Sequence, residues 1–198
     1  MASAGAFLLT LGTSLAAAQQ PQTVRVRGAI ETVDNATMTV KGRDGTTVAV
    51  KLTPNLRIRS LEKKSLADVT RGSFVGITAM PQPDGTEKAL EIHIFPEAMR
   101  GTGEGHRPWD LMPKSTMTNA NVESVVVGLG ERVLTLKYKD GEKTFSVPAN
   151  VDVVMFVPGT VADLKPGERV FVAAKKLADG TLEPLFITVG RNGVNPPM

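Results

Sequence analysis

The chain repeats itself, and this repetition constrains its fold more than any single motif does. Residues 65–95 (SLADVTRGSFVGITAMPQPDGTEKALEIHIF) align without a gap with residues 160–190 (TVADLKPGERVFVAAKKLADGTLEPLFITVG), at an offset of 95 positions. Ten of these aligned positions are identical, and further upstream MTVKGRDG (38–45) matches LTLKYKDG (134–141) at an offset of 96. A match of this length indicates two copies of one structural unit.

The pattern within one copy indicates strands. Apolar and polar residues alternate, or β-branched residues predominate, over 24–33, 37–42, 46–52, 73–80 and 88–95. Asp-Gly pairs at 44–45, 84–85, 140–141 and 179–180 predict antiparallel hairpins with type I′ turns, in which both central residues have positive φ. Between the third and fourth strands, Ser65 and Asp68 have the spacing of a capping box, which predicts one helical turn closed by Gly72.

Five strands and a helical turn in about 70 residues are typical of a small closed barrel of the OB type, with an SH3-like barrel as the alternative. We therefore predict an all-β fold made by tandem duplication of two OB-like or SH3-like antiparallel barrels. The first barrel would span 19–95 and the second 118–198, joined by a connector over 96–117. Because units of this size bury little surface alone, we expect the two barrels to pack together.

Strand parity predicts which side chains face away from each barrel core. The expected inward residues are Leu90, Ile92 and Ile94 in the first copy, and Leu185, Ile187 and Val189 in the second. The expected outward residues are Glu91, His93 and Phe95, with Phe186 and Thr188 in the second copy. Phe95 and Phe186 are thus candidates for the surface where the barrels meet or where a partner docks. Alternatively, both face inward past a β-bulge.

The first eighteen residues, MASAGAFLLTLGTSLAAA, carry no charge and end in three alanines. This pattern predicts a signal peptide over 1–18 and hence a periplasmic or secreted protein of the Gram-negative type, soluble after signal removal. The chain has no cysteine, which excludes disulfides and thiolate metal sites. Lys and Arg alternate with Asp and Glu, and there is one Trp and one Tyr, a composition that argues against nucleic-acid partners.

The connector, PEAMRGTGEGHRPWDLMPKSTM, corresponds to nothing in either copy. Loops longer than about 15 residues are usually functional or disordered, and the apolar residues of this segment favour order. We expect it to lie across a barrel with Trp109 buried. Its candidate binding residues are Met99, Arg100, His106, Arg107, Trp109 and Asp110.

A metal site is the alternative use of this region. Imidazole and thioether groups suit copper or another soft transition metal, and His93, His106, Met99, Met112 and Met117 are the candidates. Their spacing is irregular, however, and methionine is an ordinary core residue. The GTGEG segment has neither the lysine nor the helix of a phosphate loop. With two histidines and no nucleophile elbow, the sequence nominates no catalytic residue, and we expect a protein that is not an enzyme.

Three features together resemble a family of uncharacterised bacterial exported proteins built from small β-barrel repeats. These features are ALEIHIFPEAMRGTGEGHRPWDL, the ADL and DG pairs of both copies, and the terminal VGRNGVNPPM. The resemblance covers nearly the whole predicted mature chain and is most specific in EAMRGTGEGHRPWD. Members of the family often carry a label connected with metal transport. The resemblance therefore implies a soluble accessory role beside a membrane transporter, and it implies no catalytic residues.

Two function hypotheses follow. The first is a non-enzymatic periplasmic binding or scaffolding protein that holds an envelope protein or polymer through the barrel surfaces and the connector. The second is a periplasmic, copper-type metal-binding accessory protein that uses His93, His106 and nearby methionines. Binding of oligosaccharide or nucleic acid on an OB face would need stacked aromatic residues, which this composition hardly supplies.

Overall fold

The structure is a computed structural model that describes residues 23–128 and 132–196, so the predicted signal peptide lies outside the described residues. Within those ranges the fold is all-β, with thirteen strands and three single-turn 3₁₀ helices. The strands are β1 (Thr23–Val33), β2 (Thr37–Gly42), β3 (Thr47–Lys51), β4 (Ile58–Lys64), β5 (Phe74–Pro81), β6 (Glu87–Ile94), β7 (Gly105–Pro108), β8 (Thr116–Val127), β9 (Arg132–Tyr138), β10 (Gly141–Val147), β11 (Asp152–Pro158), β12 (Arg169–Lys176) and β13 (Leu182–Gly190). The short helices are η1 (Leu66–Asp68), η2 (Glu97–Met99) and η3 (Val161–Asp163).

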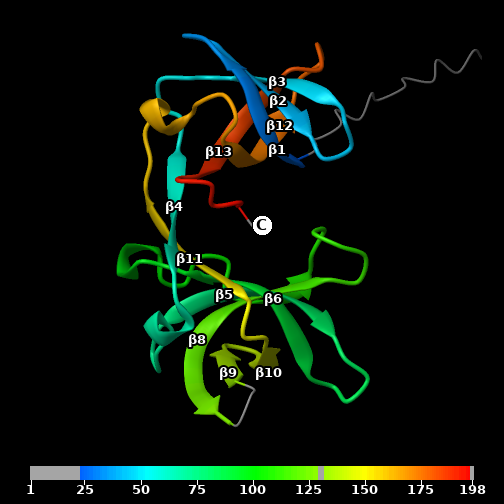
Figure 1. The fold of residues 1–198 in the computed structure, drawn as a ribbon. Helices are drawn as coiled ribbons and strands as arrows, with labels where there is room; N and C mark the ends of the chain where they lie inside the picture. The colour runs from blue at the N-terminus through cyan, green and yellow to red at the C-terminus, as the bar shows by residue number, and fades with distance from the viewer. Residues whose placement is uncertain (1–22, 129–131, 197–198) are drawn as a thin grey trace, which may run out of the picture.

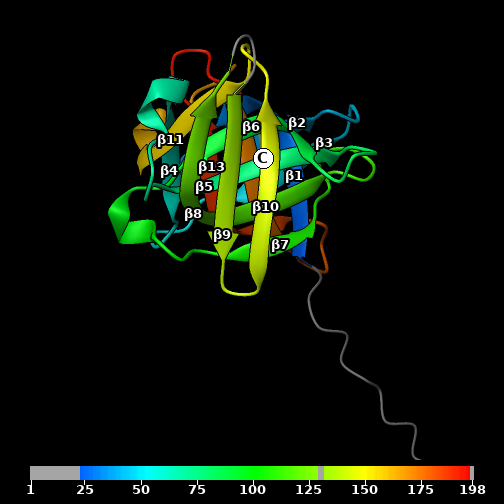
Figure 2. The same cartoon turned by 90° about the horizontal axis from the view of Figure 1, so that it is seen from below.

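The strands form two closed rings, one above the other in Figure 1. The upper ring runs β1–β2–β3–β13–β12 and returns to β1, closed by a parallel pairing of Val50 with Leu182. The lower ring runs β5–β6–β10–β9–β8 and returns to β5, closed by a parallel pairing of Glu87 with Phe145. Figure 2 shows β8, β9 and β10 side by side at the lower end of the molecule.

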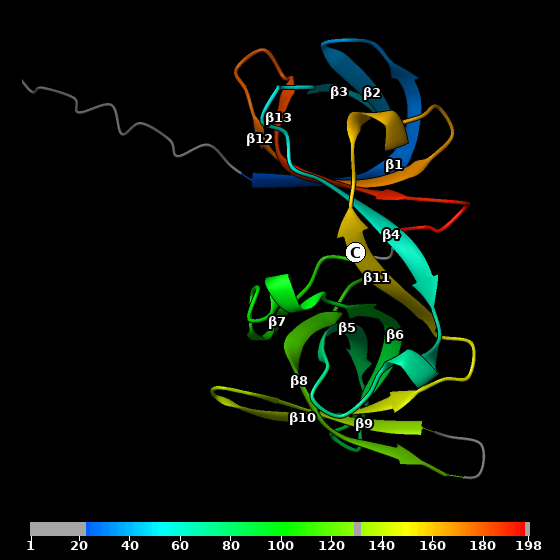
Figure 3. The same ribbon diagram turned by 90° about the vertical axis from the view of Figure 1, so that its left-hand side faces the viewer.

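Each ring takes strands from both aligned copies. The upper ring combines β1, β2 and β3 with β12 and β13, and the lower ring combines β8, β9 and β10 with β5 and β6. The predicted boundaries, with one barrel over 19–95 and the other over 118–198, therefore do not separate the two rings. The physical reason is that β4 and β11 carry the chain from one ring to the other, pairing antiparallel over Arg59–Lys64 and Val153–Pro158 (Figure 3).

The offset of 95 positions also relates the strand pairings of the two rings. Ile187 of β13 pairs with Ile58 of β4, and Ile92 of β6 pairs with Val153 of β11, so both partners shift by the same amount. Register shifts fall between Thr78 and Ala79 in one ring and between Ala173 and Ala174 in the other. These positions are aligned in the two copies, so equivalent residues have the same local structure. The duplication itself stays an inference from the sequence.

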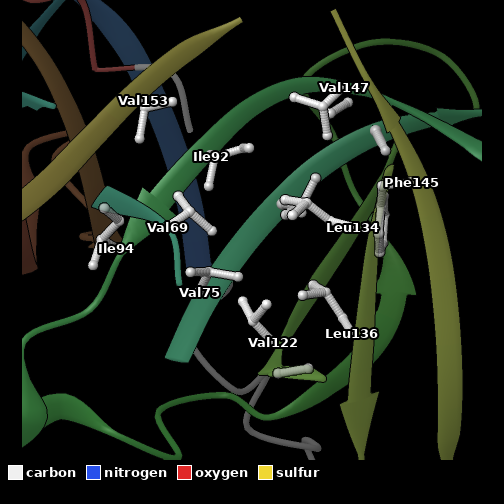
Figure 4. Packing of buried hydrophobic residues seen from close by; sticks show 14 residues of the cluster. Val69, Val75, Ile92, Ile94, Val122, Leu134, Leu136, Phe145, Val147 and Val153 are labelled. Atoms are coloured by element: carbon white, nitrogen blue, oxygen red, sulfur yellow. The ribbon is translucent and has the colours of Figure 1, made fainter. Parts of the chain in front are cut away.

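The same register shifts explain where strand parity fails. Ile92, Ile94, Ile187 and Val189 are buried in the ring cores. Leu90 and Leu185 were expected beside them, but each is the extra residue of a β-bulge, and Leu185 is 43% exposed. The lower-ring core also includes Leu134, Leu136, Phe145 and Val147, as Figure 4 shows.

All four Asp-Gly pairs lie in or beside antiparallel hairpins, but the predicted type I′ turn is wrong. Gly45, Gly85 and Gly180 have φ of 83°, 84° and 83°, whereas in the described residues only Lys114 and Asn192 have positive φ without being glycine. At these three turns the aspartate side chain instead accepts a hydrogen bond from the backbone N–H two residues later. A threonine follows the glycine each time, and its N–H is the donor.

The predicted helical turn is η1, and its capping box is present. Asp68 Oδ2 accepts hydrogen bonds from the backbone N–H and the hydroxyl of Ser65, at 2.7 and 2.9 Å. The helix ends at Val69, so Gly72, with φ of 84°, belongs to the following turn and does not close the helix. Thr160 and Asp163 repeat the box at η3, with 2.7 Å from the Thr160 N–H to Asp163 Oδ2.

Candidate functional site

An aromatic cluster fills part of the space between the two rings. Phe95, after β6, packs against Phe74 and Phe156, with ring centroids 5.3 and 5.1 Å apart. Phe186 of β13 lies beside Phe171 of β12, with centroids 5.9 Å apart. The structure thus places both candidate partner-surface residues, Phe95 and Phe186, at the contact between the rings.

A cavity of about 310 Å³ opens beside this cluster, and every part of the fold contributes to its walls. The lower ring supplies His93, Met117 and Asn119, and the upper ring supplies Arg25, Phe171, Ala173 and Phe186. The crossing strands supply Arg59 and Phe156, and the connector supplies Thr102, Gly103, Arg107 and Trp109. The cavity exists only because the rings, the crossing strands and the connector meet at one place.

Gly76 of β5 allows three of these side chains to pack closely. A Cβ at this position would lie 2.8 Å from Asn119 Oδ1, 3.1 Å from Phe95 Cε2 and 3.3 Å from His93 Nδ1. The backbone here is an ordinary strand, so glycine is required for space and not for its conformational freedom. Any larger residue would displace the side chains that form this wall.

The connector is ordered and fastened to the lower ring. Its β7 pairs antiparallel with β8, from Gly105 opposite Asn119 to Pro108 opposite Thr116. Arg100 binds Glu97 and donates hydrogen bonds to the Asn121 side chain and to the backbone carbonyl of Gly72, at 2.5 and 3.1 Å. The predicted connector over 96–117 is shortened at its end, because Thr116 and Met117 already belong to β8.

The connector reaches the upper ring through Trp109 and Asp110. The Arg25 guanidinium lies 4.5 Å from the centre of the Trp109 ring, and the Arg107 guanidinium lies 5.6 Å from it. Asp110 accepts a 2.7 Å hydrogen bond from Arg27 and lies 3.4 Å from Arg25. Burial alone would raise the pKa of Asp110, but the hydrogen bond from Arg27 and both arginine charges lower it. Trp109 is half-buried here, less than predicted.

His106, on β7 of the connector, contacts a polar cluster of the lower ring. Its Nδ1 is 2.8 Å from the Thr118 hydroxyl, and its Nε2 is 3.7 Å from a carboxylate oxygen of the buried Glu87. The Lys143 ammonium is 3.4 Å from the same oxygen. Burial lowers the pKa of His106, and the charges of Lys143 and Arg107 act in the same direction, while Glu87 opposes them.

His93 lies in a second buried cluster. Its Nε2 is 2.9 Å from Glu91 Oε1, although without the alignment of a hydrogen bond. The Thr78 hydroxyl donates to the same Glu91 oxygen at 2.8 Å and lies 3.9 Å from the Met117 sulfur. His93 is 1% exposed, so strand parity correctly gave its outward direction from the ring core but not its burial.

The five candidate metal ligands do not share one site. Met112 is 48% exposed, Met99 packs against the aromatic cluster, and His106 binds Thr118 and Glu87. Only His93 and Met117 line the same cavity. Within residues 23–128 and 132–196, His, Cys, Asp and Glu form no group of three or more that could hold a metal ion.

Several cavity residues carried no signal in the sequence. Arg25, Arg59 and Asn119 lie within strands far apart in the chain, and Phe156 and Phe171 resemble ordinary core residues of a strand. They become a site only through the exchange of strands between the rings. Strand parity pointed here through Phe95 and Phe186, and the composition of the connector did so through Arg107 and Trp109.

The chain matches no known protein family, no curated protein and no solved structure in the three comparisons made. In the part of the chain that the structure describes, no helix has the length and apolar character needed to cross a membrane.

Proposed function

We propose that this protein is a non-enzymatic binding protein that holds a small molecule with an apolar body in the cavity between its rings. The observation that supports this most is the cavity itself, at about 310 Å³ and lined by aromatic side chains with a few polar groups. Small-molecule sites are typically roughly 300 to 1,000 Å³ and have this mixture of lining groups. With the predicted signal peptide, we further propose that it works in the periplasm or outside the cell.

The contacts of the connector favour a small ligand in the cavity over an envelope polymer bound at the surface. Two charged candidates of the connector already have partners within the chain. Arg100 binds Glu97 and Asn121, and Asp110 binds Arg27. Trp109 is contacted by the guanidinium groups of Arg25 and Arg107. These connector side chains are thus bound within the chain, which favours a role in covering the cavity over one in docking a large partner.

The test uses Trp109 as a reporter, because it is the only tryptophan in the chain and it lines the cavity. Titration with 4-phenylbutyrate, 4-phenylbutyramide and 4-phenylbutanol is expected to give a saturable change in Trp109 fluorescence for at least one of the three. Replacing Ala173 by Phe fills the cavity and should abolish the change, whereas replacing the exposed Val126 by Phe should leave it intact.

Overpacking at Ala173 costs about 1 to 3 kcal/mol, so the fold of A173F is checked by circular dichroism. Thr23→Phe serves as a second variant, because Thr23 is exposed and lines the cavity. A saturable signal that survives both A173F and T23F would refute the proposal, as would the absence of any signal from the unmodified protein.

A further inference from the structure

Two arginines at the cavity have no carboxylate partner within residues 23–128 and 132–196. The guanidinium of Arg59 lies 4.6 Å from the Phe186 ring and 5.7 Å from the Phe156 ring. The guanidinium of Arg107 lies 5.6 Å from the Trp109 ring and donates one hydrogen bond, at 2.7 Å, to the carbonyl of Gly103. Asp110, the neighbour of Trp109 in the chain, contacts Arg27 and Arg25, and Glu91 accepts a hydrogen bond from Thr78.

Both arginines are half-buried, which makes an uncompensated charge unfavourable. Burial lowers the pKa of Arg59, and the neighbouring charge of Arg57 adds to the effect. Burial likewise lowers the pKa of Arg107, with a further contribution from Arg25. Each of these effects disfavours the charged form of the guanidinium, and an anion bound between the two side chains would reverse it.

The cavity also contains buried polar atoms without partners. Trp109 Nε1 and Asn119 Oδ1 are buried, and neither has a hydrogen-bond partner in the described part of the chain. The indole N–H can only donate, so the missing partner of Trp109 is an acceptor. Buried polar atoms normally have partners, so the Trp109 donor, in a cavity that Arg59 and Arg107 also line, indicates a ligand that brings negatively charged oxygen atoms. Asn119 Oδ1 is an acceptor, so a carboxylate does not supply its partner.

We infer that the ligand is a small monocarboxylate with an aromatic or other apolar body, whose carboxylate is bound by Arg59 and Arg107 and accepts a hydrogen bond from Trp109. This inference rests on the proposed function and names its ligand class. The apolar body lies against Phe156, Phe171 and Phe186. A singly charged carboxylate suits these walls better than a phosphate dianion, because removing a second charge from water would cost more in this apolar setting.

The test compares 4-phenylbutyrate with its neutral amide, 4-phenylbutyramide, by Trp109 fluorescence and by calorimetry. Hydrogen bonds to charged groups contribute about 1.5 to 3 kcal/mol, so the carboxylate should bind at least about tenfold more tightly than the amide. Arg59→Met and Arg107→Met should each weaken carboxylate binding about tenfold and leave amide binding nearly unchanged. Arg71→Met removes an exposed arginine, 78% exposed, and should change neither affinity.

The outcomes separate this inference from the proposed function. Equal affinities for the carboxylate and the amide would overturn the inference and leave the binding function standing. If the protein bound none of the carboxylate, the amide and 4-phenylbutanol, both the inference and the proposed binding function would be overturned. If R71M weakened carboxylate binding as much as R59M and R107M did, general electrostatic attraction would explain the preference, and the assignment of the two arginines would be wrong.

Discussion

Arg27 Nη2 in β1 lies 2.7 Å from Asp110 Oδ1 in the connector. This ion pair joins the upper ring to a segment that pairs with the lower ring through β7. The two residues are 83 positions apart in the chain. The ring of Trp109, next to Asp110, is contacted by the guanidinium groups of Arg25 and Arg107. The connector is thus attached at both ends of the space between the rings and forms one wall of the cavity.

Replacing Asp110 by Asn tests this attachment. The variant keeps the shape of the side chain but loses the charge that both arginines contact, and such partly exposed pairs contribute up to about 1 kcal/mol. We expect a small fall in stability and a red shift of Trp109 emission, because the indole becomes more exposed. Glu123→Gln, which removes an exposed pair with Arg71, should leave the emission unchanged. Unchanged emission in D110N would contradict this account of the connector.

His106 should titrate below its ordinary pKa of 6.5, because burial disfavours its charged form. Since the pKa is lower in the folded state than in the unfolded state, the associated stability is fully present above about pH 6.5 and is lost as the pH falls through the folded-state value. NMR titration of the two histidines measures this directly, and the His106→Gln variant assigns the signal. A His106 pKa at or above 6.5 would show that Glu87 outweighs burial.

Asp163 contributes to the stability of the fold, and this contribution is lost at acid pH. Hydrogen bonds from Arg191 lower its pKa to about 2, with further hydrogen bonds from the Thr160 N–H and the Ser60 hydroxyl. The contribution is present above pH 3.8 and is lost as the pH falls toward 2. Asp163→Asn should therefore lower stability by about 1 kcal/mol at neutral pH, with solvent screening considered.

Acid unfolding followed by circular dichroism checks this prediction. The D163N variant should lose less stability between pH 4 and pH 2 than the unmodified protein does. Asp152→Asn, at an exposed position of β11, is the matched control. Equal pH dependence in the unmodified protein and D163N would contradict the assignment.

Most strands and hairpins could be predicted from the sequence, because alternation and Asp-Gly pairs act locally. The turn type was missed since the prediction considered only Asp and Gly. The threonine that follows them in DGT (44–46, 84–86 and 179–181) indicates the hydrogen bond that is observed. The strand β4 (Ile58–Lys64) was missed because IRSLEKK alternates weakly and ends in three charged residues. The apolar run DVVMFVP of β11 was a signal that could have been used.

The exchange of strands could not be predicted from local patterns. Aligned positions of the two copies carry similar residues, so β1 could satisfy its alternation by pairing with β5 as well as with β12. What decides the partner is the direction of β4 and β11, which extend from one ring to the other. The cavity depends on the same choice, because Arg59 and Phe156 lie on these crossing strands.

The pairing of Thr23 with Lys175 across β1 and β12 provides the most direct test of this arrangement. The chain has no cysteine, so engineered pairs are its only thiols. Paired Cα atoms in antiparallel strands lie about 4.5 to 5.5 Å apart, within the range of a disulfide.

The T23C/K175C variant should form an intramolecular disulfide, seen by non-reducing electrophoresis and mass spectrometry. T23C/M80C, whose second position aligns with Lys175 in the other copy, should not. A disulfide in T23C/M80C and none in T23C/K175C would show that each copy closes its own ring, and would contradict the strand exchange on which the cavity depends.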